Sequence, residues 1–151
     1  MKYFFSIVTA LLLTSCVSTK STLKNVDSTA IRPLIKDKAY LITEYATDEK
    51  YGYDQDYPIN IGFINEKQED INIQYFFNGL EGPNGEKINY KKIETCCPFP
   101  TKNSLMGAGT IGVYEITFES QKKVTLYFNT FEKGKIVCPK GFRIKKTISK
   151  E

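Results

Sequence analysis

The sequence contains no histidine and no tryptophan. Without histidine, the chain cannot build a Ser-His-Asp or Cys-His nucleophilic centre, nor a zinc site with an imidazole ligand. It also lacks a C-x-x-C pair, the usual spacing of a thiol redox centre, and a P-loop ending in Gly-Lys-Ser/Thr. These absences exclude several common kinds of catalytic centre.

The net charge and the length of the chain limit its expected partners and its number of domains. Lys and Arg number 21 against 17 Asp and Glu, which gives a formal net charge of +4. The basic residues are not gathered into a long run, so we expect no nucleic-acid partner. We also expect no cofactor. The 151 residues suit one globular domain with unstructured flanks.

Residues 1–15 show the order of regions that is typical of a secretory signal peptide. Lys2 precedes an apolar run from Tyr3 to Leu13, which is too short to span a bilayer as a permanent helix. The segment "LTSC" (13–16) resembles the bacterial lipobox, and the resemblance implies cleavage before Cys16 and acylation of that residue. An ordinary signal peptide that happens to contain a cysteine is the alternative.

The next segment, residues 16–36, is rich in Ser, Thr and Lys and predicts a flexible tether. Residues 17–20 contain no acidic side chain. The acidic signals associated with surface export or with retention at the inner membrane are therefore missing. We expect a lipid anchor at Cys16 on the periplasmic face of the outer membrane, with the membrane as one partner and an envelope protein or the cell wall as another.

Residues 37–151 are expected to form one globular domain. Alternating, β-branched and aromatic residues predict strands at 39–47, 59–65, 87–95 and 141–146. Ile73, Phe76, Phe77 and Leu80 recur at helical spacing and predict one amphipathic helix, although alternation in the same segment would equally suit a strand.

The segment 113–131 predicts a β-hairpin. Tyr114, Ile116 and Phe118 alternate with their neighbours before a polar "SQKK" turn, and a second alternating run follows that turn. Together these elements predict a small α+β domain with a mainly antiparallel sheet, one short helix and a C-terminal β-hairpin.

An acidic, tyrosine-rich loop over 48–58 is the first candidate site. Tyr51, Tyr53 and Tyr57 could stack on a sugar or grip a partner, or they could pack beside the core. The acids of this loop lack the EF-hand glycine and its final bidentate Glu, so we expect them to be solvated rather than to bind calcium.

The segment "GAGTIG" (107–112) matches the letters of the dinucleotide-binding fingerprint. That fingerprint needs a strand before it and a helix after it, and here the predicted hairpin strand follows. We therefore expect a tight or mobile loop. With the tyrosines, Gly107 and Gly109 could form the rim of a ligand site.

The remaining thiols are Cys96, Cys97 and Cys138. In an exported protein, cysteines normally form disulfides, and an odd number is left once Cys16 is acylated. We expect Cys138 to bond either Cys96 or Cys97, which would close a loop of about 40 residues and stabilise the domain by roughly 4 kcal/mol. A Cys96–Cys97 bond and a fully reduced set are the alternatives.

Several segments together resemble a family of small uncharacterised lipoproteins from Bacteroidota. They are "YGYDQDYPINIG", "LEGPNGEKINYKKIETCCPF", "VYEITFESQKKVTLYFNTFEKG" and "CPKGF", within residues 50–143. Members often carry the label 2-dehydro-3-deoxyphosphooctonate aldolase. That aldolase is a (β/α)₈ barrel, a fold of about 200–250 residues or more, so the resemblance implies a fold and an envelope location but no catalytic residues.

The function expected from the sequence is a membrane-anchored envelope lipoprotein with a non-catalytic structural or interaction role. A lipoprotein that binds a glycan or small molecule is the first alternative. An enzyme is the second, either the labelled aldolase or a thiol protein that uses Cys96 or Cys97.

Overall fold

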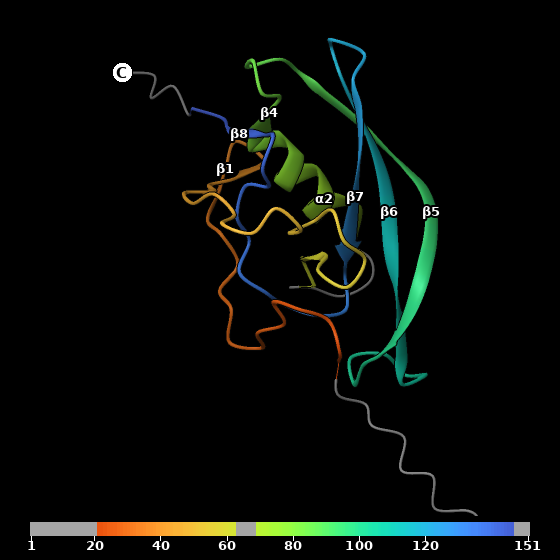
Figure 1. Ribbon diagram of the computed structural model, residues 1–151. Coiled ribbons are helices and arrows are strands. Elements are labelled where there is room, and N and C mark those ends of the chain that lie inside the picture. The colour runs from red at the N-terminus through yellow and green to blue at the C-terminus, as the bar shows by residue number, and fades with distance from the viewer. Residues whose placement is uncertain (1–20, 63–68, 147–151) are drawn as a thin grey trace, which may run out of the picture.

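The computed structural model describes residues 21–62 and 69–146, which form one layer of β-sheet covered on one side by a helix and long loops (Figure 1). The elements are β1 (Ile35–Lys36), β2 (Ala39–Tyr40), β3 (Ile59–Asn60), α2 (Glu69–Asn78), β4 (Leu80–Glu81), β5 (Ile88–Pro100), β6 (Ala108–Phe118), β7 (Lys123–Asn129) and β8 (Arg143–Ile144).

The main sheet has the strand order β3-β7-β6-β5. Its β5–β6 and β6–β7 pairs are antiparallel, and β3 lies parallel to β7. The strands β1–β2 and β4–β8 form two further antiparallel pairs. The predicted small α+β fold with a mainly antiparallel sheet is therefore confirmed.

The predicted hairpin is confirmed as β6 and β7. Ile116 pairs with Val124, and Tyr114 pairs with Leu126, so apolar residues face one another across the strands. The turn between them includes Gln121 with a φ of 64°, a left-handed conformation that tight turns demand. β6 begins at Ala108, earlier than predicted, because its first residues pair with β5.

The predicted helix is also confirmed. Ile73, Phe76 and Phe77 are buried on the face that α2 turns to the sheet. The ring centroids of Phe76 and Phe77 lie 5.3 and 5.5 Å from that of Phe128 on β7. Aromatic contacts of this kind join helix and sheet into one core. Leu80, the last residue of the predicted pattern, begins β4 instead.

The other predicted strands differ in length. β5 runs to Pro100, through the cysteine pair, because β6 offers it a partner along its whole length. The segment predicted as a strand over 39–47 keeps strand pairing only at β2 and at a bridge between Tyr45 and Cys138. Of the strand predicted at 59–65, β3 covers the first two residues and Ile61 forms an isolated bridge with Lys133, while residues 63–65 lie outside the described part. The strand predicted at 141–146 shortens to β8.

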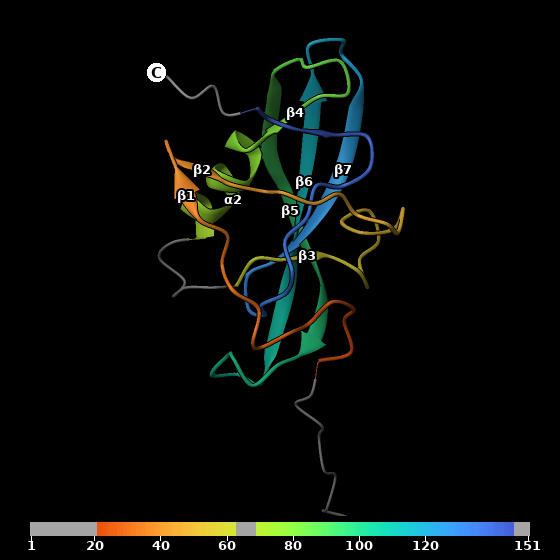
Figure 2. The ribbon, with the colours of Figure 1, turned by 90° about the vertical axis from the view of Figure 1, so that its left-hand side faces the viewer.

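The predicted boundary between tether and domain is too late in the chain. The amide of Asn60 donates hydrogen bonds to the carbonyls of Lys24 and Asn25, and the backbone NH of Asp27 donates to the carbonyl of Lys133. These bonds fix the segment from Lys24 onward to the globular part. In Figure 2 this segment runs along the domain before it reaches β1.

The predicted signal peptide and the predicted lipid site at Cys16 lie outside the described residues. Within 21–62 and 69–146, no helix is both long enough and apolar enough to cross a bilayer.

Candidate functional site

The first predicted rim residue, Tyr51, is buried in the core, and it also contributes to the lining of a small pocket. Its side chain is 2% exposed, its hydroxyl donates to the carbonyl of Lys135, and the backbone NH of Val137 donates to it. Burial raises the pKa of this phenol far above its ordinary value. Tyr51 therefore holds the segment 135–137 in place. Of the two roles expected for the tyrosines, packing beside the core is the one that fits this residue.

The other two tyrosines are half-buried beside it. Tyr53 donates a hydrogen bond to the carbonyl of Lys140, and loss of hydration raises its pKa to about 12. The Tyr57 ring packs edge-on against Tyr51, with centroids 5.5 Å apart. The ammonium of Lys24 lies 5.5 Å from the centroid of Tyr57, a cation–π contact that helps to hold the N-terminal segment.

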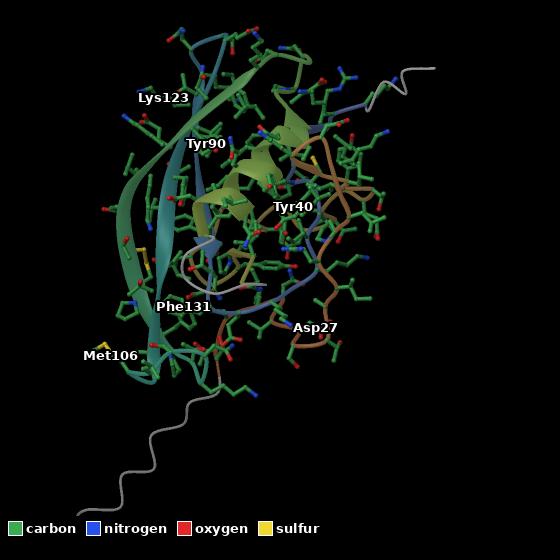
Figure 3. All side chains as sticks on the ribbon, turned by 180° about the vertical axis from the view of Figure 1, so that it is seen from behind. Asp27, Tyr40, Tyr90, Met106, Lys123 and Phe131 are labelled. Atoms are coloured by element: carbon green, nitrogen blue, oxygen red, sulfur yellow. A yellow bond between two sulfur atoms is a disulfide. The ribbon has the colours of Figure 1, made fainter. Side chains whose placement is uncertain are left out.

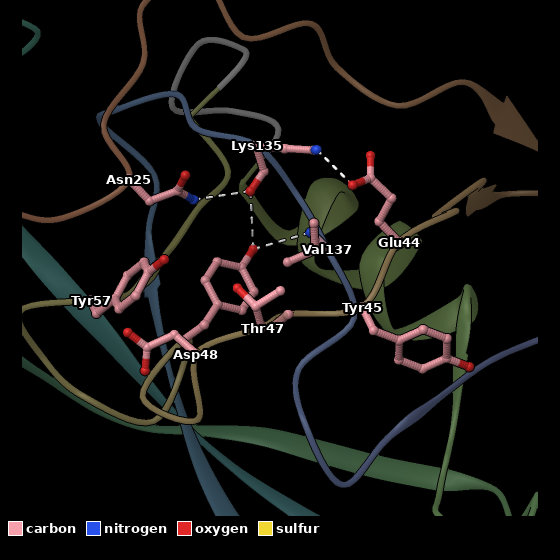
Figure 4. A pocket seen from close by; sticks show the side chains of 10 residues that line it. Asn25, Glu44, Tyr45, Thr47, Asp48, Tyr57, Lys135 and Val137 are labelled. Carbon is pink, nitrogen blue, oxygen red and sulfur yellow. Dashed lines mark hydrogen bonds and ion pairs between the residues drawn. The ribbon is translucent and has the colours of Figure 1, made fainter.

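A shallow pocket of about 200 Å³ opens beside these rings (Figure 4). Its lining includes Asn25, Tyr45 and Tyr57, and an ion pair of 2.7 Å between Lys135 Nζ and Glu44 Oε2 lies at its edge. Pockets that enclose a drug-sized ligand span about 300–1,000 Å³, so this one fits only a small molecule or a side chain.

The acidic side chains of the loop serve its own turns. Asp48 accepts a hydrogen bond from the backbone NH of Lys50, and Asp54 accepts one from that of Asp56. Such bonds are the usual use of Asp in turns. Among the residues that the structure describes, no group of three or more Cys, Asp or Glu side chains is placed to hold a metal ion.

The two predicted glycines lie at the far end of the β5–β6 hairpin, and neither lines the tyrosine pocket. Gly107 has a φ of +70° in the turn, where glycine is favoured. Gly109 passes so close to Phe99 and Phe131 that a Cβ there would lie 2.8 Å from the Phe131 ring. Of the predicted rim residues, the pocket thus brings together Tyr51 and Tyr57, and its lining does not include Tyr53 or the two glycines.

A buried polar network that the sequence analysis missed holds this end of the hairpin. Thr101 donates to Oε1 of Glu132, and Asn103 donates to Oε2 of the same carboxylate and to the carbonyl of Phe131. Thr101 is fully buried and Glu132 is 7% exposed. No local motif signals this network, because its partners lie about 30 residues apart in the sequence.

The cysteines are arranged differently from the preferred expectation. Cys96 and Cys97 form a disulfide with each other, and Cys138 is a free, buried thiol. The expected bond between Cys138 and one member of the pair is therefore wrong. Cys138 does not meet the pair because the two positions belong to different parts of the fold. Cys138 forms a backbone bridge with Tyr45, in the loops that cover the sheet, whereas Cys96 pairs with Ile111 within the β5–β6 hairpin.

The disulfide lies where the register of β5 shifts against β6, between Cys96 and Phe99. Cys97 has a φ of 56°, a left-handed conformation that is uncommon for a residue with a side chain. Its Sγ lies 3.0 Å from Oε1 of Gln55. A disulfide sulfur carries no hydrogen, so this is a contact and not a hydrogen bond. The pair thus forms part of a bulge that bends the strand.

Cys138 is enclosed by protein. Its side chain is fully buried, and loss of hydration raises its pKa to about 12. Reactive cysteines have lowered pKa values and some exposure, so this thiol has the properties of a structural residue.

The outer strand of the main sheet, β5, is largely exposed. It is 13 residues long and lies at one end of the strand order. Across the sheet beside it, Glu115 forms ion pairs of 3.1 Å with Lys91 and 3.3 Å with Lys123. The hydrogen bonds from these two ammonium groups lower the pKa of Glu115.

Three surface features thus stand out in the described part of the chain: the outer edge of β5, the β5–β6 turn and the small pocket beside Tyr51. Comparison with other proteins adds no residue roles to them. No protein-family model matches the chain, and no curated protein or solved structure matches it significantly.

Proposed function

We propose that this protein is a non-catalytic envelope lipoprotein, anchored through acylated Cys16, that binds an envelope protein along the outer edge of β5. The lipobox-like "LTSC" segment supports the anchor. The length and exposure of β5 support the interaction, and this observation carries the proposal.

The edge of β5 has the properties of a strand-binding surface. An edge strand presents backbone NH and carbonyl groups that a second chain can pair with, and adding a strand in this way is a common mode of peptide recognition. Strands average about five or six residues, so a 13-residue edge strand offers an unusually long template. Ile93, near its middle, is 48% exposed.

The two halves of β5 differ in how well their outer backbone edge can pair with a second strand. The half that follows Ile93 carries a register shift, the disulfide, Pro98 and Pro100, and prolines and bulges both block strand pairing. From Ile88 to Lys92 the strand pairs regularly with β6. We therefore place the partner strand along residues 88–92.

Photo-crosslinking in cells tests the proposed edge. A photoreactive residue at Asn89 or Ile93 of the full-length protein should give a discrete adduct with one envelope protein. The matched control is Lys122, which is exposed in the turn between β6 and β7. The same adduct from Lys122, or no adduct from either position on β5, would contradict the proposed interface.

Mass spectrometry of the N-terminal peptide tests the anchor separately. Protein extracted from membranes should begin at Cys16 and carry acyl chains on it. An intact residue 1–15 segment, or a mature N-terminus without acyl chains, would remove the anchor from the proposal.

A second candidate function is binding of a small polar molecule such as a monosaccharide. The observation that favours it is the pocket, whose lining includes Tyr45, a residue that is 55% exposed, and the ion-paired Lys135 and Glu44. Aromatic faces and polar groups together are suited to sugars. A monosaccharide that raises the melting temperature of the wild type, but not of a Tyr45→Ala variant, would support it.

A further inference from the structure

The turn between β5 and β6 exposes two adjacent large apolar side chains. Leu105 is 109% exposed relative to its reference value, and Met106 is 91% exposed. Figure 3 shows Met106 at the outer end of this turn, beyond the body of the domain. We call residues 102–107 the hairpin tip. Single exposed apolar residues are common, but an adjacent pair with almost no protein contact is a feature that needs an explanation.

The hairpin tip is held in shape by hydrogen bonds, so its exposure is built into the fold. The backbone NH of Thr101 donates to the carbonyl of Gly107 over 3.0 Å, and the NH of Gly107 donates to the carbonyl of Ser104 over 3.1 Å. Within the tip, the side-chain amide of Asn103 donates hydrogen bonds to the carboxylate of Glu132 and to the carbonyl of Phe131. These bonds hold the turn in the conformation in which Leu105 and Met106 are exposed.

The charge around the tip suits a membrane surface. Between Glu94 and Glu115 the sequence contains one charged residue, Lys102, and it is basic. Lys102 is exposed next to the two apolar side chains. A lysine beside exposed apolar residues is the combination that peripheral membrane segments use, because the ammonium group meets lipid phosphates while the apolar groups enter the acyl boundary.

The hairpin tip lies at the end of the domain from which the N-terminal segment departs. In Figures 1 and 2 the described N-terminal segment begins, in red, at the same end of the domain as the turn between β5 and β6, and the turn between β6 and β7 lies at the opposite end. Ser21 comes five residues after Cys16. A fully extended chain covers at most about 3.6 Å per residue, so an anchor at Cys16 holds Ser21 within about 18 Å of the bilayer surface.

We propose that the hairpin tip is a second membrane contact, in which Leu105 and Met106 enter the phospholipid bilayer that holds the anchor. This inference rests on the proposed function, because it takes Cys16 to be acylated. Two membrane contacts fix the orientation of the domain relative to the bilayer, which the lipid anchor at Cys16 alone leaves free. The long axis of β5 and β6 then stands away from the membrane, and residues 88–92 of β5 are held clear of the lipid for a partner.

Tryptophan fluorescence can test this contact, because the natural chain contains no tryptophan. A Leu105→Trp variant places one reporter at the tip, and Met106→Trp provides a second. Glu119→Trp is the matched control, since Glu119 is exposed at the opposite end of the domain. Each full-length variant is purified from membranes and reconstituted into vesicles of phosphatidylethanolamine and phosphatidylglycerol, with and without brominated acyl chains. Mass spectrometry records the acylation of each sample.

The expected result is a shift of the Leu105→Trp and Met106→Trp emission to shorter wavelength on reconstitution. Brominated lipid should quench both, and neither effect should occur with Glu119→Trp. If the acylated tip variants emit as the control does, the membrane contact is overturned while the anchor stands. A wavelength shift without quenching by brominated lipid would mean contact between protein copies, which also overturns it. If Cys16 carries no acyl chain, both proposals fall.

Discussion

The hydroxyl of Thr101 donates a 2.5 Å hydrogen bond to Oε1 of Glu132 in a buried site, across 31 residues of sequence. This bond joins the base of the hairpin tip to the segment that follows β7. Because the loop it secures carries the exposed Leu105 and Met106, the bond matters both for stability and for the proposed membrane contact.

We expect Thr101→Val to destabilise the domain. The substitution preserves the shape of the side chain but removes the donor, which leaves one oxygen of a buried carboxylate with fewer partners. Hydrogen bonds to charged groups contribute about 1.5–3 kcal/mol, so the free energy of unfolding should fall by about that amount. Urea denaturation measures the loss.

Thr101→Ser is the control for this prediction, since it keeps the hydroxyl and removes only a methyl group. It should lose about 1 kcal/mol or less, the scale of one buried CH₂. Equal destabilisation by the two variants would show that packing, and not the bond to Glu132, determines the effect.

We expect the Cys96–Cys97 disulfide to contribute little to global stability. In the chain-entropy model the stabilisation grows with the length of the closed loop, and adjacent cysteines close the smallest loop possible. A Cys96→Ser, Cys97→Ser double variant should therefore lose about 1 kcal/mol, well below the roughly 4 kcal/mol of a 40-residue loop. Thermal unfolding without reductant measures the difference.

Peptide mapping without reductant checks the pairing itself. A single peptide with an internal Cys96–Cys97 bond is the expected product. A peptide cross-linked to Cys138 would contradict the arrangement described above.

We expect Cys138 to resist alkylation in the folded protein. Burial shields its sulfur and raises its pKa from 9.0 to about 12, so both access and the thiolate fraction fall. Iodoacetamide should modify Cys138 at least about tenfold more slowly in buffer than in urea. Equal rates in the two conditions would show that the site around Cys138 opens readily.

The elements that could be predicted from the sequence are those with a local periodic signal. Alternation around Ile116 and Phe118 identified the hairpin, and the helical spacing of Ile73 and Phe76 matched α2. In both cases the residues that determine the structure lie within one segment.

The features that could not be predicted depend on long-range pairing. The docking of Lys24 and Asn25 depends on the amide of Asn60, and the base of the hairpin tip depends on Glu132. The expectation that cysteines of an exported protein form disulfides favoured a bond to Cys138, yet sheet register decides which thiols meet, and a single sequence does not specify that register.

We expect the domain to lose stability as the pH rises from about 10 to about 12. Loss of hydration raises the pKa of Tyr40 and of Tyr53 to about 12, against the ordinary value of 10.0 that the unfolded chain has. In that window the unfolded state binds fewer protons than the folded state, so the free energy of unfolding falls with pH. Below about pH 10 the contribution is fully present. Urea denaturation at several pH values, followed by circular dichroism, measures the slope.

Tyr40→Phe separates this effect from general alkaline damage. Tyr40 donates a 2.6 Å hydrogen bond to Asn72, so the variant should lose about 1 kcal/mol at neutral pH. Because it no longer has a phenol to ionise at that site, its stability should fall less steeply between pH 10 and 12 than that of the wild type. Parallel curves for the two proteins would show that Tyr40 does not contribute to the alkaline loss.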